Sequence, residues 1–334
     1  MRVTIKDIAR EAGVSVTTVS RVLNNKADVS DKTREKVLKI IDRLNYNPNS
    51  IARGLVMNKT YTIGLIVPDI SNAFFAEIAK AIEDELREYG YSVIFCNTDN
   101  DKDREKESID LLRSKQVDGL IGAFSHDSKD EVLALGKAGF PIVQIDRLVD
   151  DSQIPFVIID NILSGYEATE YLIKKGHRRI AHITGALDTN TGIRRAEGYR
   201  KALQEYGIEI DEELVMEGDF SQESGYLAMK EILERNKDLT AVFAGNDMMA
   251  LGAYRAIYAA GLKIPEDISI IGHDDFTLAS LVSPALTTMQ QPIYKIGKVA
   301  ASLLIDIIKG KKNKEGLIVV NTSLIERSSV KTIH

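Results

Sequence analysis

The sequence is poor in the residues that build disulfide-linked and metal-bound structures. Its 334 residues include one cysteine, Cys96, and no tryptophan. A single cysteine forms no disulfide framework within a chain, and the five histidines, at positions 126, 177, 182, 273 and 334, lack the paired spacing His-x-x-x-His. Small disulfide-linked domains and zinc modules are therefore excluded, and we expect no metal site.

Longer patterns are missing as well. No apolar run is long enough to span a bilayer, and the N-terminus lacks the charged-then-apolar pattern of a signal peptide. We therefore expect a cytoplasmic protein without a membrane partner. Neither a phosphate-binding Gly-Lys-Ser/Thr loop nor a Gly-x-Ser-x-Gly elbow occurs, so we expect no cofactor and no enzymatic activity.

Charge is divided unevenly along the chain. Residues 1–60 contain 12 Lys and Arg against 6 Asp and Glu, a net charge of +6, whereas the whole chain carries −6. The remaining residues therefore carry a net charge of −12. A basic end on an acidic body is the asymmetry expected when only that end meets nucleic-acid phosphates.

The basic end contains the pattern of two short helices. Thr4 and Asp7 form a capping-box-like start to the first helix, Gly13 ends it, and Ser15 can cap the second. Helical spacing places Val19, Val22 and Leu23 on the inner face of the second helix. The residues left on its outer face are Val16, Thr17, Ser20, Arg21 and Asn24.

A third helix is predicted from Ser30, and it closes a small apolar core. Its spaced residues are Thr33, Val37, Ile40, Ile41 and Leu44. Two capped helices joined at a glycine also describe an ordinary αα-hairpin, which is the commoner structure. The positive charge and the short polar outer face favour a helix-turn-helix that reads base edges in the major groove.

These residues occur in runs that resemble the DNA-binding head of the lactose-repressor (LacI/GalR) family. The runs are Thr4-Ile5-Lys6-Asp7-Ile8-Ala9, Ala12-Gly13-Val14-Ser15, Thr18-Val19-Ser20-Arg21-Val22-Leu23-Asn24 and Asn45-Tyr46-Asn47-Pro48-Asn49, followed by Ala52-Arg53-Gly54-Leu55. The resemblance implies base contacts from Val16, Thr17 and Arg21. It implies phosphate contacts from Ser15, Ser20, Asn24 and Thr33.

The segment from Pro48 to Met57 is too short to be stable as a free helix. The resemblance implies that it becomes a hinge helix when two subunits meet over DNA, with Ala52 at the helix pair and Leu55 wedged into the minor groove. Asn49 and Arg53 complete this motif. The alternative is that Leu55 is an ordinary apolar linker residue.

From Tyr61 onward, short β-rich runs alternate with amphipathic helices, which is the pattern of parallel sheets covered on both faces. The predicted strands are 63–67, 93–97, 120–123 and 142–145 in one unit, and 180–183, 214–217, 242–244 and 268–271 in the next. The expected fold is an all-α helix-turn-helix head followed by an α/β two-lobe body like periplasmic binding proteins, with two Rossmann-like parallel sheets.

The resemblance extends to this body and implies three crossings between the lobes, near Asp160, Gln291 and Thr322. The expected domains are therefore a head of residues 1–46, a hinge of 47–60, a first lobe of 61–160 with 292–322, and a second lobe of 161–291 with 323–334. Ligands of open α/β sheets bind at the carboxyl ends of the strands, so the cleft between the lobes is the expected site.

Polar and aromatic residues at the predicted strand ends suit a sugar, because planar polar groups satisfy hydroxyls and aromatic faces cover the ring. The set resembles the pocket of ribose-binding proteins and ribose-type repressors. By that resemblance Phe74, Phe75 and Phe220 enclose the ring, and Asn72, Asp146, Arg147, Arg195, Asn246, Asp274 and Gln291 bind hydroxyls and the ring oxygen.

Each of these residues also has a structural interpretation. Strand-end Asp and Asn often cap helices, Asp247 is expected to be such a cap, and the Phe pair could belong to the core. His273 stands where the resemblance leads one to expect an aromatic or apolar residue, which would alter the pocket floor.

The combined hypothesis is a homodimeric repressor that binds an approximately palindromic operator and senses a monosaccharide, ribose or a related pentose. One alternative is a global carbon-catabolite regulator that uses a phosphorylated carrier protein as corepressor; its sugar pocket would be degenerate. Another is a sugar-binding transport component or a sugar-processing enzyme, which the DNA-binding head argues against.

Overall fold

The computed structural model describes residues 3–23, 26, 28–44, 59–147, 149, 154–236, 238–311 and 316–333. It divides into two compact units, Met1–Tyr61 and Thr62–His334. We describe each unit by itself. Within the described residues, no helix is long and apolar enough to cross a membrane.

The described residues of the first unit form three helices around a small apolar core. They are α1 (Ile5–Ala12), α2 (Val16–Leu23) and α3 (Asp31–Arg43). The predicted capping box is present, because Asp7 accepts hydrogen bonds from the backbone and hydroxyl of Thr4 at 3.0 and 2.6 Å. Gly13 ends α1 at a φ of 66°, a conformation that glycine adopts without strain.

The second unit contains two six-stranded sheets. The first sheet consists of β1 (Thr62–Val67), β2 (Ser92–Asn97), β3 (Gly119–Gly122), β4 (Ile142–Ile145), β5 (Phe156–Ile159) and β11 (Leu317–Val320). The second consists of β6 (Ile180–Thr184), β7 (Val215–Glu217), β8 (Ala241–Ala244), β9 (Ser269–Asp274), β10 (Thr287–Gln290) and β12 (Ser323–Ile325).

Helices connect the strands of both sheets. Those of the first lobe are α5 (Ala73–Glu88), α6 (Lys102–Ser114), α7 (Lys129–Lys137) and α13 (Ile293–Ile308), with the 3-10 turn η1 (His126–Ser128). Those of the second lobe are α8 (Asn161–Lys174), α9 (Asn190–Glu205), α10 (Gln222–Arg235), α11 (Asp247–Ala259) and α12 (Thr277–Leu281), with the turn η2 (Glu212–Leu214).

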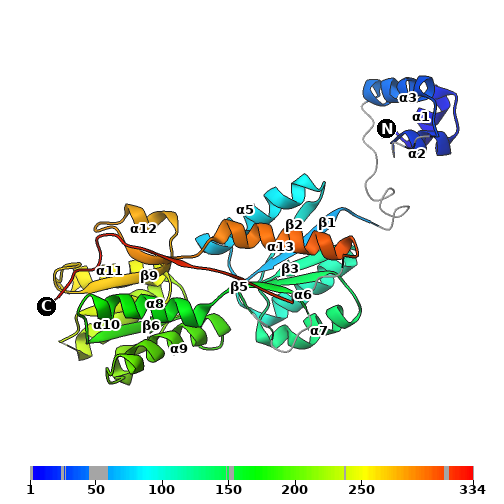
Figure 1. Cartoon of the computed structure of the whole chain (residues 1–334). Coiled ribbons are helices and arrows are strands. Elements are labelled where there is room, and N and C mark those ends of the chain that lie inside the picture. The colour runs from blue at the N-terminus through cyan, green and yellow to red at the C-terminus, as the bar shows by residue number, and fades with distance from the viewer. Residues whose placement is uncertain are drawn as a thin grey trace. The chain divides into compact units, whose positions relative to one another are not determined.

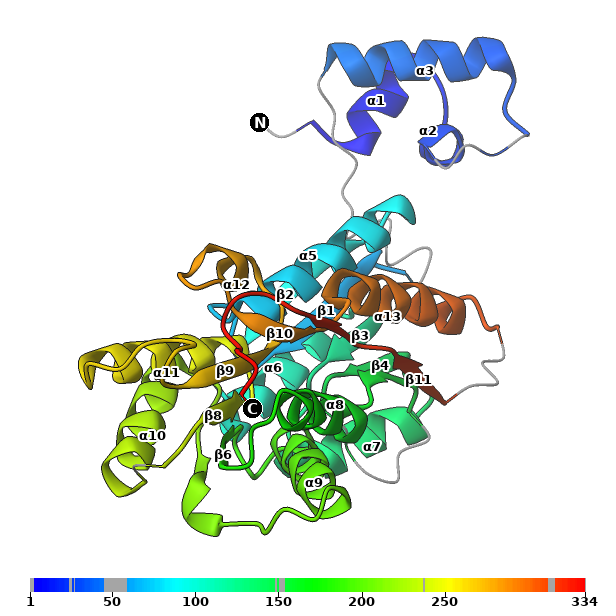
Figure 2. The same cartoon turned by 60° about the vertical axis from the view of Figure 1, so that its left-hand side comes forward.

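The strand orders are β11-β5-β4-β3-β1-β2 and β12-β10-β9-β8-β6-β7. The chain therefore passes between the sheets three times: after β5, after β10, and after β11 (Figure 1). Figure 2 shows the last of these passages in red, where the chain leaves the first lobe and ends along the second.

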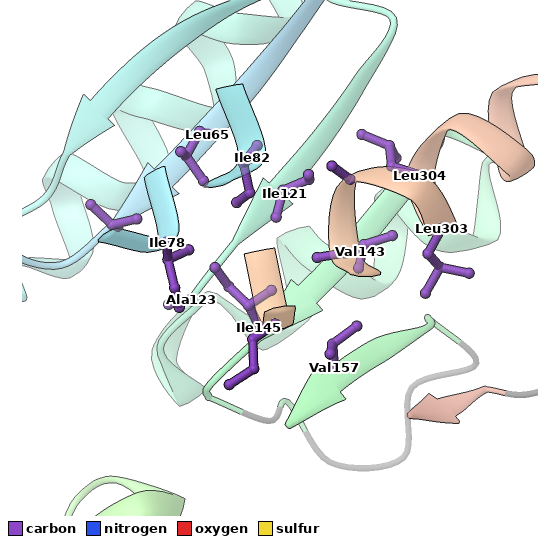
Figure 3. Packing of buried hydrophobic residues seen from close by; sticks show 14 of the residues in the cluster. Leu65, Ile78, Ile82, Ile121, Ala123, Val143, Ile145, Val157, Leu303 and Leu304 are labelled. Atoms are coloured by element: carbon purple, nitrogen blue, oxygen red, sulfur yellow. The ribbon is translucent and has the colours of Figure 1, made fainter. Parts of the chain in front are cut away.

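Helices cover both faces of each sheet. In the first lobe α5 and α13 lie on one face, where Ile78, Ile82 and Leu304 pack against strand residues such as Val143 (Figure 3). The opposite face meets α6 and α7 in a second apolar cluster. In the second lobe α10 and α11 cover one face, and α8 and α9 the other.

The predicted fold class is confirmed, with one difference in the second sheet. All eight predicted strands exist within a few residues of their predicted bounds. The difference is β12, which runs antiparallel to β10. Parallel strands of both lobes end at the cleft, and β12 begins there because only two residues separate it from the end of β11. It therefore runs away from the cleft.

Candidate functional site

The outer face of α2 is open to solvent in the first unit. Val16 is 41% exposed, and Thr17 and Arg21 are also exposed. Ser20 is half-buried, so it is less accessible than a residue predicted for the outer face should be. Arg21 forms an ion pair with Asp28 through Nη1 and Oδ2 at 3.2 Å, and both side chains are more than half exposed. Such a pair is weak enough to open toward another acceptor.

Two predicted phosphate-contacting residues have capping contacts. Ser15 Oγ accepts from the backbone N–H of Thr18 at 3.0 Å, which fixes the start of α2. The Thr33 backbone N–H donates to Ser30 Oγ at 3.4 Å at the start of α3. The remaining predicted DNA-contacting residues lie outside the described residues: Asn24, Asn49, Ala52, Arg53 and Leu55.

The second unit contains a cavity of about 170 Å³ between its lobes. All ten residues predicted for the sugar pocket line it: Asn72, Phe74, Phe75, Asp146, Arg147, Arg195, Phe220, Asn246, Asp274 and Gln291. They follow β1 and β4 in the first lobe, and β6, β7, β8, β9 and β10 in the second. These residues are predicted because they follow the carboxyl ends of strands. Those strand ends meet at the cleft, which brings the residues together.

The aromatic residues belong to the cavity and to the core. The rings of Phe74 and Phe75 meet edge to face with centroids 5.0 Å apart, and both residues are 6% exposed. They also join the apolar cluster under α5 and α13. Phe220, from the other lobe, packs against the core beside α10 and α11. The Phe pair therefore belongs to the core and also lines the cavity, while its contact with a sugar ring stays a prediction.

Asp274 and Arg195 form the buried polar centre of the cavity. Asp274 Oδ1 accepts from Gln291 Nε2 at 2.7 Å and lies 3.8 Å from Arg195 Nη1. Arg195 is 2% exposed, and it donates through Nε to Asn161 Oδ1 at 2.9 Å and through Nη1 to the carbonyl of Gly245 at 2.6 Å. Burial lowers the pKa of Arg195, and the carboxylates of Asp274 and Asp146 oppose this effect.

Asp146 and Arg147 face the cavity from the first lobe. Desolvation raises the pKa of Asp146, while Arg147 and Arg195 counteract the rise and Asp274 adds to it. Arg147 donates through Nη2 to Asn100 Oδ1 at 2.6 Å, and both residues line the cavity.

Four of the cavity residues have unusual backbone conformations. The φ angles of Asn100, Asp146, Phe220 and Asp274 are 58°, 60°, 69° and 120°. A non-glycine residue with positive φ costs about 1 to 3 kcal/mol, and such strain concentrates at ligand sites. Its occurrence at four positions around one cavity supports a functional role for the cavity.

Two sequence-based interpretations are wrong in detail. Asn246, not Asp247, caps α11: its Oδ1 accepts from the Met249 N–H at 2.8 Å. Asp247 is fully buried and accepts from Thr288 Oγ1 at 2.6 Å, and burial together with Asp274 raises its pKa well above the usual value. His273 does not form part of the pocket floor, because it lies behind Asp274 and contacts the cavity only through that residue.

Sequence reasoning missed about half of the lining. The missed residues are Pro68, Asp69, Ser71, Asn100, Thr189, Thr191, Asp219, Ser221, Gln222 and Met248. Nearly all follow the same strands, so a wider window after each strand would have found them. Thr191 stands out because its Oγ1 is buried and has no hydrogen-bond partner within the described part of the chain.

Comparison with known protein families matches each unit to a family model, and both models name the LacI family. Residues 4–49 match the model described as bacterial regulatory proteins, lacI family. Residues 60–327 match the model for periplasmic binding proteins and the sugar binding domain of the LacI family. Together the two matches cover nearly the whole chain.

Two characterised relatives span almost the full length. Catabolite control protein A of Priestia megaterium is 42% identical over 305 residues, covering 91% of this chain and 92% of the relative. The HTH-type transcriptional repressor PurR of Vibrio atlanticus (strain LGP32) is 40% identical over 332 residues, covering 99% of both.

Solved structures agree with the fold. The lac repressor dimer bound to operator and the anti-inducer ONPF matches with a TM-score of 0.91 and 31% identity, covering 99% of this chain and all of that one. A transcriptional regulator from Enterococcus faecium with bound ribose matches with a TM-score of 0.75 and 32% identity, covering 82% of this chain and all of that one.

Proposed function

The chain belongs to the LacI family of DNA-binding, ligand-responsive transcriptional regulators, and we propose that it is a repressor controlled by a monosaccharide, ribose or a closely related pentose. The observation that carries this proposal is the composition of the cavity between the lobes. Three Phe side chains and fifteen polar side chains from both lobes line it, and the three Phe and seven of the polar side chains stand at positions predicted from the sequence. Aromatic faces suit the C–H sides of a sugar ring, and planar polar groups suit its hydroxyls.

The size and charge of the cavity favour a small uncharged sugar. Its volume of about 170 Å³ is below the roughly 300–1,000 Å³ of sites that take drug-sized ligands. Four carboxyl groups, Asp69, Asp146, Asp219 and Asp274, line it against two guanidiniums, Arg147 and Arg195. A phosphorylated sugar would meet net negative charge there, so we infer that the effector is unphosphorylated.

The relatives support a regulator but differ in name. The Enterococcus faecium regulator holds ribose, which favours a pentose for this chain as well. The names catabolite control protein A and PurR point to other signals. The choice of ribose therefore rests on the cavity residues and on the likeness to the ribose-bound regulator, and not on the names of these two relatives.

A second candidate is supported by the 42% identity to catabolite control protein A. In that case a phosphorylated carrier protein would act as corepressor, and operator binding would respond to that protein. The complete set of sugar-binding side chains in the cavity favours the first candidate, because a regulator that responds only to a protein would have no need of them.

The proposed mechanism joins the cavity to DNA through a homodimer. A sugar that contacts both lobes draws them together, and the first lobes of the two subunits then shift relative to each other. The paired segments that precede the body would separate, and affinity for an approximately palindromic operator would fall. The role is regulatory, and conversion of the sugar in a turnover assay would contradict it.

Calorimetry on the full-length protein tests the proposal. Ribose should release or absorb heat on binding, ribose 5-phosphate should not, and a selected operator should weaken ribose binding by the factor by which ribose weakens operator binding. Asp274→Ala and Arg195→Ala should each cost about 1.5 to 3 kcal/mol of sugar affinity while ligand-free operator binding is retained. No binding of ribose or any other pentose would refute the effector assignment. An operator response to a phosphorylated carrier protein alone would favour the second candidate.

A further inference from the structure

His273 is fully buried and lies behind the cavity. It is the next-to-last residue of β9, directly before Asp274. Its Nδ1 is 3.1 Å from Asp274 Oδ1, and its Nε2 is 3.0 Å from Ser164 Oγ on α8. Neighbouring side chains of an extended strand point to opposite faces. The φ of 120° at Asp274 breaks this alternation and allows the carboxylate to reach the preceding imidazole.

The contacts define which nitrogen of His273 carries the proton. Burial, assisted by the charge of Arg195, lowers the pKa of His273 to about 4, so its ring is neutral at pH 7. A carboxylate accepts hydrogen bonds and a serine hydroxyl can donate or accept. Ser164 Oγ also lies 3.3 Å from the carbonyl oxygen of Asn161, so two acceptors compete for its one hydroxyl proton. Because Nδ1 faces a carboxylate, Nδ1 carries the ring proton and donates it to Asp274, which leaves Nε2 as the acceptor for the Ser164 hydroxyl at the shorter distance of 3.0 Å. The contact with Asp274 is then a hydrogen bond and not an ion pair.

Helix α8, which carries Ser164, also holds the buried guanidinium of Arg195. Asn161, on the first turn of α8, accepts from Arg195 Nε at 2.9 Å, and Ser164 lies one turn further along. The helix begins directly after the first passage between the sheets. Gln291, which donates to Asp274 Oδ1, follows β10 at the second passage. Oδ1 of Asp274 is thus linked to the first passage through His273 and Ser164, and to the second passage through Gln291.

We propose that His273 is a positioning residue, whose imidazole relays a hydrogen bond from Ser164 to Asp274 and so fixes the carboxylate that receives the effector. With Oδ1 occupied by His273 and Gln291, Oδ2 is the oxygen left for a ligand hydroxyl. His273 thereby takes a polar role at a position where an apolar side chain could not hold the carboxylate. The inference rests on the proposed sugar-binding function of the cavity.

Ribose calorimetry on matched variants tests the relay. His273→Phe keeps an aromatic ring but removes both hydrogen bonds, and we expect affinity to fall about tenfold. His273→Asn keeps a donor near the position of Nδ1 and should recover most of that loss. Ser164→Ala removes only the outer bond and should have a smaller effect in the same direction. Unchanged affinity in both His273→Phe and Ser164→Ala would overturn the proposal.

Two controls separate positioning from a general structural role. In an Asp274→Asn background, His273→Phe should change ribose affinity by less than about twofold, because the group it positions is already altered. A full tenfold loss in that background would contradict the relay. His182→Phe replaces another fully buried histidine of the same sheet that does not line the cavity, and should leave affinity unchanged even if stability falls.

A measurement without ligand distinguishes failure of the relay from failure of the sugar assignment. Nitrogen-15 NMR of histidine-labelled full-length protein at pH 7, assigned by the signal lost in His273→Phe or, should that variant not fold, in His273→Asn, should show a neutral ring with its proton on Nδ1. A proton on Nε2, or a charged ring, would refute the relay whatever the protein binds. The correct tautomer with no binding of any monosaccharide would refute the proposed function and leave the relay supported.

Discussion

Single residues of the cavity join folding to binding, and Asn246 is the clearest case. Its Oδ1 caps α11, and its Nδ2 donates to the carbonyl of Phe220 at 3.0 Å. Phe220 in turn has a positive φ of 69° that this contact helps to hold. A loss of ligand affinity in an Asn246 variant would therefore not by itself identify a direct contact with the ligand.

Thr191 allows the contribution of a residue to folding to be separated from its contribution to ligand binding. Its hydroxyl is buried at the cavity and has no partner among the described residues. We expect Thr191→Val to raise the free energy of unfolding by about 1 kcal/mol in the absence of ligand, because an unsatisfied buried hydroxyl is removed, and to lower ribose affinity about tenfold. Urea denaturation and calorimetry measure the two effects.

The control for Thr191→Val is Thr184→Val. Thr184 is also fully buried, but its hydroxyl donates to the carbonyl of Gly185 at 2.8 Å. This variant should lose stability where Thr191→Val gains it. A loss of stability of equal size in both variants would mean that Thr191 is already satisfied without ligand.

Arg21 is the residue of α2 with the greatest expected effect on operator recognition. We expect Arg21→Ala to weaken binding to a selected operator by about 1 to 3 kcal/mol, because a side chain that bonds a base edge is lost. Stability should hardly change, since its ion pair with Asp28 is exposed. Titration at fixed salt, with Lys39→Ala on α3 as an equal change of charge, is the measurement. Equal losses in both variants would indicate a purely electrostatic contribution.

His182 gives a test of stability against pH. Burial lowers its pKa from 6.5 to about 3, and its Nδ1 contacts the carbonyl oxygen of Phe243 at 2.9 Å. The unfolded chain binds a proton below pH 6.5 that the folded protein excludes, so this stability is present above pH 6.5 and is lost as pH falls. His182→Phe removes that loss.

Between pH 7 and pH 5 the stability difference between His182→Phe and the natural chain should therefore shift by about 2 kcal/mol in favour of the variant. Urea unfolding at the two pH values provides the measurement. The variant can be less stable at pH 7, because it loses a hydrogen bond, without affecting the argument. A difference that stays constant with pH would show that His182 becomes protonated within the folded state.

At the scale of helices, close packing depends on glycine at a few contacts. A Cβ at Gly165 of α8 would meet the backbone carbonyl of Arg195 on α9, and a Cβ at Gly297 of α13 would lie 2.7 Å from the Cβ of Ala81 on α5. Both Gly165→Ala and Gly297→Ala should lower the free energy of unfolding by about 1 to 3 kcal/mol, because the helices must separate.

Only Gly165→Ala should also weaken ribose binding, because α8 and α9 hold the Asn161–Arg195 hydrogen bond. Chemical denaturation followed by calorimetry below the unfolding transition distinguishes the two effects. A comparable loss of affinity in Gly297→Ala would mean that α5 and α13 govern the cavity as strongly as α8 and α9 do.

The elements also show how far sequence alone could reach. Periodicity located the head helices and eight strands, because each has its own apolar pattern. It missed β5, β10, β11 and β12. Length alone is not the reason, because β3, β4, β7 and β8 also have three or four residues each. Polar residues interrupt β10 (TTMQ) and β12 (SLI), so these two strands give no continuous apolar run. Strand ends gave the cavity residues, but the contact between His273 and Ser164 joins positions far apart in the chain and depends on how α8 packs.

At the scale of the whole molecule, exposed apolar side chains suggest how two copies would meet. Leu227 of α10, Tyr258 of α11, and Leu278 and Leu281 of α12 are 55%, 44%, 47% and 70% exposed. Apolar groups gathered on one side of a lobe are typical of an association surface. The hydroxyl of Tyr258 donates to the carbonyl of Ser283 at 2.7 Å, which places α11 beside the chain that leaves α12.

We therefore expect a fragment of residues 62–334 to sediment as a dimer at micromolar concentration and to bind ribose as the full chain does. Leu281→Asp in that fragment should give a monomer, because a charge would be buried at the interface. Leu163→Asp, at a leucine of α8 that is 48% exposed, should leave the dimer intact. A monomeric parent fragment would contradict this surface and the proposed homodimer.

The passages between the sheets also determine the order in which the protein can be completed during its synthesis. The first lobe needs α13 and β11, which come after the whole α8–β10 segment of the second lobe. When β5 leaves the ribosome, the apolar face of the first sheet around Val143 can be covered by α5 but still lacks α13. Nascent chains tend to fold domain by domain from the N-terminus. Here the lobe that starts first must wait for almost the last residues, and a chain released early would leave part of that apolar face uncovered.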